Sequence, residues 1–167
     1  YFEELSGVDY TGYTTTTHDG KTYYLYTSLD VRSAGTTAGQ QHGPAFDGYD
    51  CENADSGTMT TAPTGYDYAI NYFYTPQKFD ILYRDGVYKD GNDNPVEGYS
   101  SRGVLDTVED IAYQTSLTTY NSGGTNYYSP TYSGFTFAGW YMDEACTSPY
   151  TFTTMPIGGV VVYDKWI

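Results

Sequence analysis

Two segments near the C-terminal end decide the fold: residues 133–150 read SGFTFAGWYMDEACTSPY, and residues 160–166 read VVVYDKW. Aromatic and β-branched side chains dominate both segments, which is typical of strands that pack against a core. Gly134 and Gly139 allow tight turns or close backbone approach, and Asp143-Glu144 is expected in an exposed turn. Large aromatics each bury on the order of 150–250 Å², so we expect four of them in the core: Phe135, Phe137, Trp140 and Trp166. A surface Trp that stacks on a sugar is the alternative.

Working outward, the rest of the chain also reads as short strands. Residues 21–27 (KTYYLYT) follow the turn dipeptide Asp19-Gly20, and residues 66–74 alternate with tyrosines on one face. Residues 79–84 (FDILYR) and 111–113 (IAY) are further strand candidates. The chain is therefore expected to be mainly β-structure.

Helix signals are few. Residues 116–122, which end at Gly123-Gly124, predict one short helix, and residues 106–110 predict a weaker one. Residues 33–45 read as a loop. The sequence thus predicts a β-rich α+β fold.

A boundary is expected at residues 75–78 (TPQK), because Pro76 removes a ladder donor between two strand-like runs. The predicted organisation is two small domains in tandem, residues 1–78 and 79–167. We expect so short a linker to hold the neighbouring domains in a semi-fixed orientation.

Composition excludes several classes of protein. The 167 residues include 21 acids against 7 Lys plus Arg, a net charge of −14, which leaves no basic patch for a nucleic-acid partner. The 22 Tyr and 2 Cys exclude a coiled coil, a disulfide scaffold and a disordered chain. No run approaches the ~20 apolar residues of a membrane span, so no membrane insertion is expected in this segment.

The C-terminal half resembles a known repeat. The residues that carry the resemblance are Gly134, Phe135, Phe137, Gly139, Trp140 and Tyr141, then Cys146-Thr147-Ser148-Pro149, and finally Tyr163, Lys165 and Trp166. In this order they resemble the internalin-type B repeat, also called the Listeria–Bacteroides repeat, over residues 79–167. Residues 85–110 depart from the usual short first hairpin of that family.

The N-terminal half resembles the mucin-binding-protein (MucBP-like) repeat through residues 46–50 (FDGYD), 56–59 (SGTM) and 69–74 (AINYFY). Both resemblances imply β-grasp-like folds in tandem, with neighbouring repeat domains of the same chain as partners. They also imply an extracellular, cell-surface or cell-wall location, with any anchor outside this segment, since the chain reads as a piece of a longer protein. The implied role is a stalk or spacer, or part of an adhesin.

Tyrosine-rich surfaces bind proteins and sugars, because the ring is amphipathic and loses little rotamer entropy when it is fixed. The candidate ligand-binding residues are Tyr23, Tyr24, Tyr26, Tyr72 and Tyr74, and a host glycoprotein, mucin or glycan is the candidate partner. The alternative is cross-strand aromatic pairing that only stabilises thin sheets.

No catalytic constellation is recognisable, so we expect neither an enzyme nor a cofactor. His18 and His42 lack a partner at metal-ligand spacing and are expected at the surface, so no metal site is predicted.

Cys51 and Cys146 fall in different halves, and Cys146 is expected as a small buried hydrophobe rather than in a disulfide. Residues 90–94 (DGNDN) offer oxygen ligands for Ca²⁺, but their spacing fails the EF-hand pattern and favours a polar turn.

Overall fold

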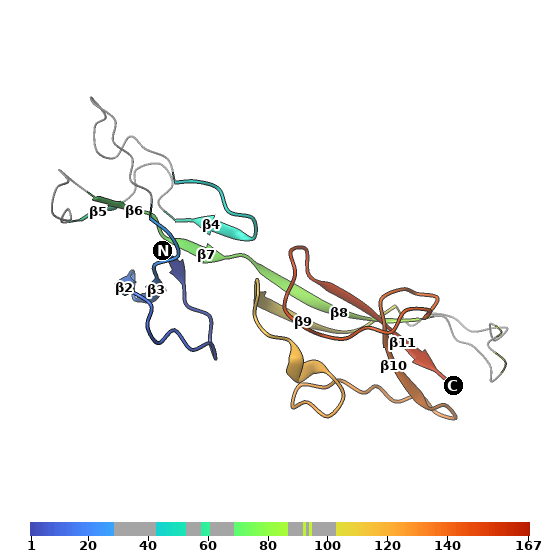
Figure 1. The fold of residues 1–167 in the computed structure, drawn as a ribbon. Helices are drawn as coiled ribbons and strands as arrows, with labels where there is room; N and C mark the ends of the chain where they lie inside the picture. The colour runs from blue at the N-terminus through green and yellow to red at the C-terminus, as the bar shows by residue number, and fades with distance from the viewer. Residues whose placement is uncertain (29–42, 53–57, 61–68, 87–91, 93, 95–102) are drawn as a thin grey trace. The chain divides into compact units, whose positions relative to one another are not determined.

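A computed structural model describes residues 1–28, 43–52, 58–60, 69–86, 92, 94 and 103–167 (Figure 1). The chain divides into two compact units, unit 1 (Tyr1–Gln77) and unit 2 (Lys78–Ile167). The described residues are β-rich and contain a single short 3-10 helix, η1 (Thr118–Tyr120). No described helix is long and apolar enough to cross a membrane.

Unit 1 contains a five-stranded sheet and a separate two-stranded sheet. The larger sheet has the order β2-β3-β1-β7-β4, from β2 (Thr15–His18), β3 (Lys21–Tyr24), β1 (Phe2–Glu3), β7 (Tyr74–Pro76) and β4 (Tyr49–Cys51). β1 and β7 are parallel, and the other pairs are antiparallel. The smaller sheet pairs β5 (Thr58–Thr60) with β6 (Ala69–Asn71).

The hairpin of β2 and β3 confirms the turn predicted at Asp19-Gly20. His18 pairs directly with Lys21, which leaves a two-residue loop. Both loop residues have positive φ, 47° for Asp19 and 79° for Gly20. This is the backbone of the type I′ turn, whose twist matches that of the flanking strands and which favours Asp-Gly.

Unit 2 is a four-stranded sheet in the order β10-β11-β8-β9. Its strands are β10 (Phe137–Tyr141), β11 (Val160–Trp166), β8 (Lys78–Asp85) and β9 (Val104–Ala112). β11 and β8 are parallel, with register pairs from Val160↔Ile81 to Asp164↔Asp85, while the two outer pairs are antiparallel.

One face of this sheet carries the core of unit 2. Alternate residues of the two central strands are buried there, and Trp140 of β10 joins them. The segment between β9 and β10, together with residues 150–155, packs over this face. The buried cluster is Ile81, Tyr83, Leu117, Trp140, Phe152, Met155, Val160 and Val162.

Three sequence expectations for unit 2 need correction. Residues 106–110 are not helical but lie within β9, because the β8 edge offers them a ladder partner. Of residues 116–122 only η1 is helical. Phe135 is 39% exposed and stacks on Tyr132 at 5.3 Å between ring centroids, so it lies outside the core.

Within the described residues, no α-helix covers any of the three sheets, so the short helix of a β-grasp-like fold is not seen. In unit 1, residues 69–74 do not form one strand: β6 ends at Asn71, and β7 of the other sheet begins at Tyr74. Several residues in earlier predictions lie outside the described part of the chain: residues 33–42 with His42, and Tyr66, Tyr68, Asp90 and Asp93.

Candidate binding surface

The register of unit 1 separates its side chains onto two faces of the five-stranded sheet. Cross-strand partners share a face and successive residues alternate, so Phe2, Tyr24 and Tyr74 lie on one face. Glu3 and Tyr23 lie on the other. We call the first the aromatic face and the second the His18 face, because His18 pairs with Lys21, two residues from Tyr23 on the same side of β3.

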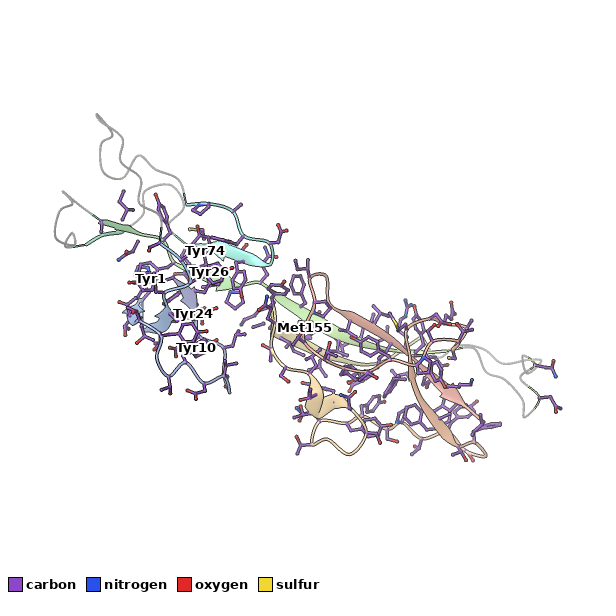
Figure 2. All side chains as sticks on the ribbon, in the orientation of Figure 1. Tyr1, Tyr10, Tyr24, Tyr26, Tyr74 and Met155 are labelled. Carbon is purple, nitrogen blue, oxygen red and sulfur yellow. The ribbon has the colours of Figure 1, made fainter. Side chains whose placement is uncertain are left out.

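Phe2 is the centre of the aromatic face. It is 4% exposed and stacks on Tyr26 at 4.3 Å with an interplanar angle of 4°. Tyr49 stacks on it at 4.2 Å, while Phe46 and Tyr74 lie at 5.1 and 5.4 Å. Figure 2 shows Tyr10, Tyr24, Tyr26 and Tyr74 gathered about the strands of this sheet.

A second group of rings extends the aromatic face beside β3. Tyr10 stacks on Tyr24 at 4.7 Å, and Tyr13 meets Tyr24 edge to face at 5.3 Å. Burial raises the pKa of Tyr24 to about 12, and its tyrosine neighbours add to the rise. Tyr13 is 56% exposed, so this group has an open side.

The five tyrosines proposed from the sequence have different environments. Tyr23 is fully buried and Tyr74 is 3% exposed, so both pack within the unit and present no open ring face. Tyr74 also donates a hydrogen bond to the Pro44 carbonyl at 2.6 Å. Tyr24 and Tyr72 are half-buried, and Tyr26 is 55% exposed. The accessible part of the predicted set therefore centres on Tyr24 and Tyr26, and the structure adds Tyr10 and Tyr13.

The His18 face combines aromatic and charged groups. The His18 ring stacks on Phe73 at 4.0 Å, and Tyr23 contacts Phe73 edge to face at 5.0 Å. Lys21 forms ion pairs with Glu3 at 3.1 Å and with Glu52 at 3.5 Å. The His18 side chain is 22% exposed, so it reaches the surface while one part of it packs against Phe73.

The Gly-Trp-Tyr motif of unit 2 and the aromatic residues around it are divided between core and surface. Trp140 and Trp166 are 5% and 2% exposed, and the Trp140 indole donates a hydrogen bond to the Tyr128 carbonyl at 2.9 Å. Phe137, Tyr141 and Tyr163 are half-buried. Core packing, rather than a surface Trp platform, is therefore the role of Trp140.

The two glycines of this motif are required by the backbone conformation. Gly134 and Gly139 have φ values of +89° and +120°, which L side chains rarely adopt, and a Cβ on either would meet no neighbouring atom. Gly139 also follows a register shift in β10. Positive φ, not close packing, is the reason for glycine at both positions.

The turn after β10 is organised by Asp143. Its carboxylate accepts hydrogen bonds from the backbone N–H groups of Thr147 and Ser148, both at 2.9 Å. The Thr147 bond is the main reason that the pKa of Asp143 is lowered. Cys146, at φ 52°, is buried as expected, and Cys51 and Cys146 are not joined in a disulfide.

These features define unit 2 as a small β-sheet domain with an aromatic core and a Gly-Trp-Tyr motif on its edge strand. Residues 99–165 match the family model of the Listeria-Bacteroides repeat domain, which confirms the resemblance of this segment. The match begins after β8 and does not extend into unit 1. Such a bacterial repeat fits a repeat segment of a surface protein.

No curated protein and no solved structure matches the chain.

Proposed function

We propose that the chain is a load-bearing, non-catalytic stalk segment of a bacterial cell-surface protein, located outside the cell with its anchor beyond these residues. The observation that carries this proposal is the parallel pairing of β8 and β11, the first and last strands of unit 2. In a stalk the chain continues at both ends. Tension then acts at Lys78 and at Trp166, which lie at opposite ends of the parallel ladder.

Such loading pulls the two strands along each other. All the ladder hydrogen bonds between Val160↔Ile81 and Asp164↔Asp85 then carry load together, and they must break nearly at once. Load that opens the ladder from one end breaks them one at a time and meets less resistance. Forced unfolding is governed by the unfolding rate, so this barrier decides how long a stalk survives under tension.

Unit 1 repeats the arrangement on a smaller scale. β1 and β7 are parallel neighbours at Phe2↔Tyr74. The backbone nitrogen of Tyr1 donates to the Tyr72 carbonyl, and the Tyr74 N–H donates to the Tyr1 carbonyl, both at 2.9 Å. This ladder is shorter than that of unit 2, so we expect unit 1 to yield first.

The test is force spectroscopy on the full chain with handles in two positions. Handles at residues 78 and 167 load the β8–β11 ladder along its strands. Handles at Asn92 and residue 167 open it from the end where Asp85 meets Asp164. The protein is the same in both cases, so a difference in unfolding force cannot come from a difference in equilibrium stability. We expect the unfolding force to be several-fold higher with handles at residues 78 and 167. Equal forces would refute the load-bearing role.

A second candidate function is binding of a neutral glycan, such as one carried by a host glycoprotein or mucin, to the aromatic face. The supporting observation is Tyr26, whose ring stacks flat on Phe2 while the residue as a whole remains 55% exposed. An open, immobilised ring of this kind stacks on the apolar face of a sugar. The net charge of −14 disfavours sialylated or sulfated chains.

Titration of the full chain with neutral and sialylated mucin glycans tests this candidate. We expect weak binding of the neutral glycans alone, lost in Tyr26→Ala and reduced in Tyr13→Ala. The matched control is Tyr132→Ala, since Tyr132 is also exposed and stacked on a phenylalanine but lies in unit 2. Equal binding by Tyr26→Ala and wild type would remove the aromatic face as the site.

A further inference from the structure

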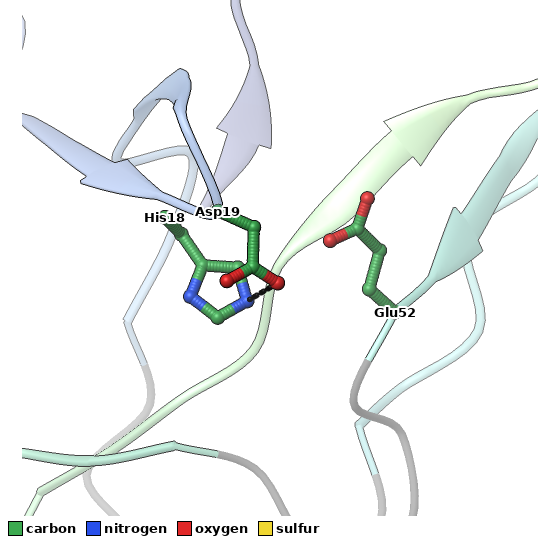
Figure 3. Close-up of side chains that lie close together, drawn as sticks. All are labelled: His18, Asp19 and Glu52. Carbon is green, nitrogen blue, oxygen red and sulfur yellow. Dashed lines mark ion pairs between the residues drawn. The ribbon is translucent and has the colours of Figure 1, made fainter.

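Three potential metal ligands meet on the His18 face of unit 1. The ligand atoms of His18, Asp19 and Glu52 all lie within 4.8 Å of one another (Figure 3). His18 ends β2 and Asp19 begins the β2–β3 turn, whereas Glu52 directly follows β4. β2 and β4 are the two edge strands of the sheet, so these side chains come from opposite edges.

The sheet must be strongly twisted and curled for this to occur. The stacking of His18 on Phe73, which precedes β7, shows the same closure, since β3 and β1 separate β2 from β7 in the sheet. Glu52 is held from the other side, because its N–H donates to the Phe73 carbonyl at 2.9 Å. Phe73 is thus the common support for both edges.

The imidazole is already oriented for coordination. Its ring lies parallel to Phe73, with an interplanar angle of 4°, so stacking occupies a face of the ring. The nitrogen lone pair lies in the ring plane and remains directed past Phe73. Nε2 is 3.5 Å from the Asp19 carboxylate, as the dashed line in Figure 3 marks.

We propose that His18, Asp19 and Glu52 bind a divalent cation of the Zn²⁺ class. A mixed set of one imidazole and two carboxylates suits Zn²⁺ and its neighbours, whereas Ca²⁺ selects oxygen ligands alone. Ligands at ~2.1 Å from Zn²⁺ lie roughly 3–4 Å apart, so these three groups need to close by only about 1 Å. The Asp19 side chain is 81% exposed and that of Glu52 is 29% exposed, which leaves them room to rotate.

Lys21 competes with a metal ion for one of the proposed ligands, Glu52. Its ammonium lies 3.5 Å from Glu52 and 3.1 Å from Glu3. Metal binding must share or displace the Glu52 contact, which weakens the affinity. Removing the ammonium is therefore expected to strengthen metal binding.

Bound metal would join the β2–β3 turn to the end of β4. Three protein ligands leave coordination positions for water or a group from another molecule. The direct consequence is stabilisation of unit 1, because a ligand that binds only the folded state raises its melting temperature. This role is independent of both functions proposed above.

The test is calorimetric titration of the full chain with Zn²⁺, combined with thermal unfolding with Zn²⁺, with Ca²⁺ and with EDTA. We expect one Zn²⁺ bound per chain, a rise in melting temperature that EDTA reverses, and no effect of Ca²⁺. His18→Phe keeps a ring against Phe73 but removes the nitrogen donor. It should lose affinity by more than the 10- to 100-fold typical of outer-shell changes.

Matched variants keep the proposal falsifiable if His18→Phe does not fold. Asp19→Asn and Glu52→Gln preserve shape and should each weaken Zn²⁺ binding, whereas Lys21→Met should strengthen it several-fold. His42→Ala, which changes the other histidine, should leave binding unchanged. Equal Zn²⁺ affinity in wild type, Asp19→Asn and Glu52→Gln, or no Zn²⁺ binding by the wild type, would overturn the proposal.

Discussion

At the scale of single residues, the buried acids of unit 2 have the clearest consequence. Asp85 and Asp164, 2% and 0% exposed, are the buried charged residues of the described part of the chain, and they are register partners on β8 and β11. The Gly86 N–H donates to Asp164 at 2.9 Å, and the Cys146 thiol donates to the Asp164 carbonyl at 3.3 Å. The β8–β11 ladder therefore ends in a polar, enclosed site.

This site predicts a pH-dependent stability. Burial raises the pKa of Asp164 to about 6, against the opposing Gly86 hydrogen bond and with a further rise from Asp85. An unfolded Asp titrates near 3.9, so the folded state binds the proton more tightly. The free energy of unfolding should fall as pH rises from about 4 to 6, by on the order of 3 kcal/mol, and then level off.

Asp164→Asn should remove this dependence. The amide oxygen still accepts from Gly86, and the repulsion between two buried carboxylates at Asp85 and Asp164 is removed, so the variant should be more stable than wild type at pH 8. Urea unfolding midpoints between pH 4.5 and 8 measure the effect. Asp106→Asn, which changes an exposed residue of β9, is the control and should retain the wild-type dependence. A wild-type midpoint that rises over this range would contradict the prediction.

At the scale of secondary structure, strands with long apolar or aromatic runs could be predicted, and short polar ones could not. Residues 160–166 form β11 over the expected range, and residues 79–84 form most of β8. The helix prediction for residues 106–110 is wrong. Its basis, a Thr followed by acidic residues, is a weak helix preference, and the hydrogen bonds to β8 stabilise a strand instead. Tertiary pairing outweighed local preference there.

Local sequence patterns also do not predict which strands are neighbours in a sheet. The alternation of residues 69–74 suggested one strand, but its two ends lie in different sheets. Parallel pairing of β8 with β11 joins residues nearly 80 positions apart, as in Asp85↔Asp164. No turn signal marks such a pairing, so the load-bearing geometry becomes visible only in the folded unit.

At the scale of the whole molecule, the chain is two units with separate cores. Unit 1 is built around Phe2, Tyr23, Phe73 and Tyr74, and unit 2 around the cluster that contains Ile81 and Trp140. We therefore expect the two units to unfold independently.

Calorimetry of the full chain should show two unfolding transitions. A shorter protein of residues 78–167 should reproduce one of them within a few degrees. Zn²⁺ should shift only the transition that is missing from the shorter protein, because His18, Asp19 and Glu52 all lie in unit 1. A single cooperative transition, lost on truncation, would show that the cores are coupled.

The sequence by itself determined the β-rich character, the Asp19-Gly20 turn and the aromatic core residues Trp140 and Trp166, because these depend on local preference and on hydrophobicity. Only the tertiary structure decided which tyrosines are open, as the burial of Tyr23 and exposure of Tyr26 show. The tertiary structure also places His18 close to Glu52, because the curled sheet brings its two edge strands together. The spacing of these residues in the sequence does not indicate this proximity. Long-range strand pairing is set by the packing of the whole unit, and a linear pattern does not contain it.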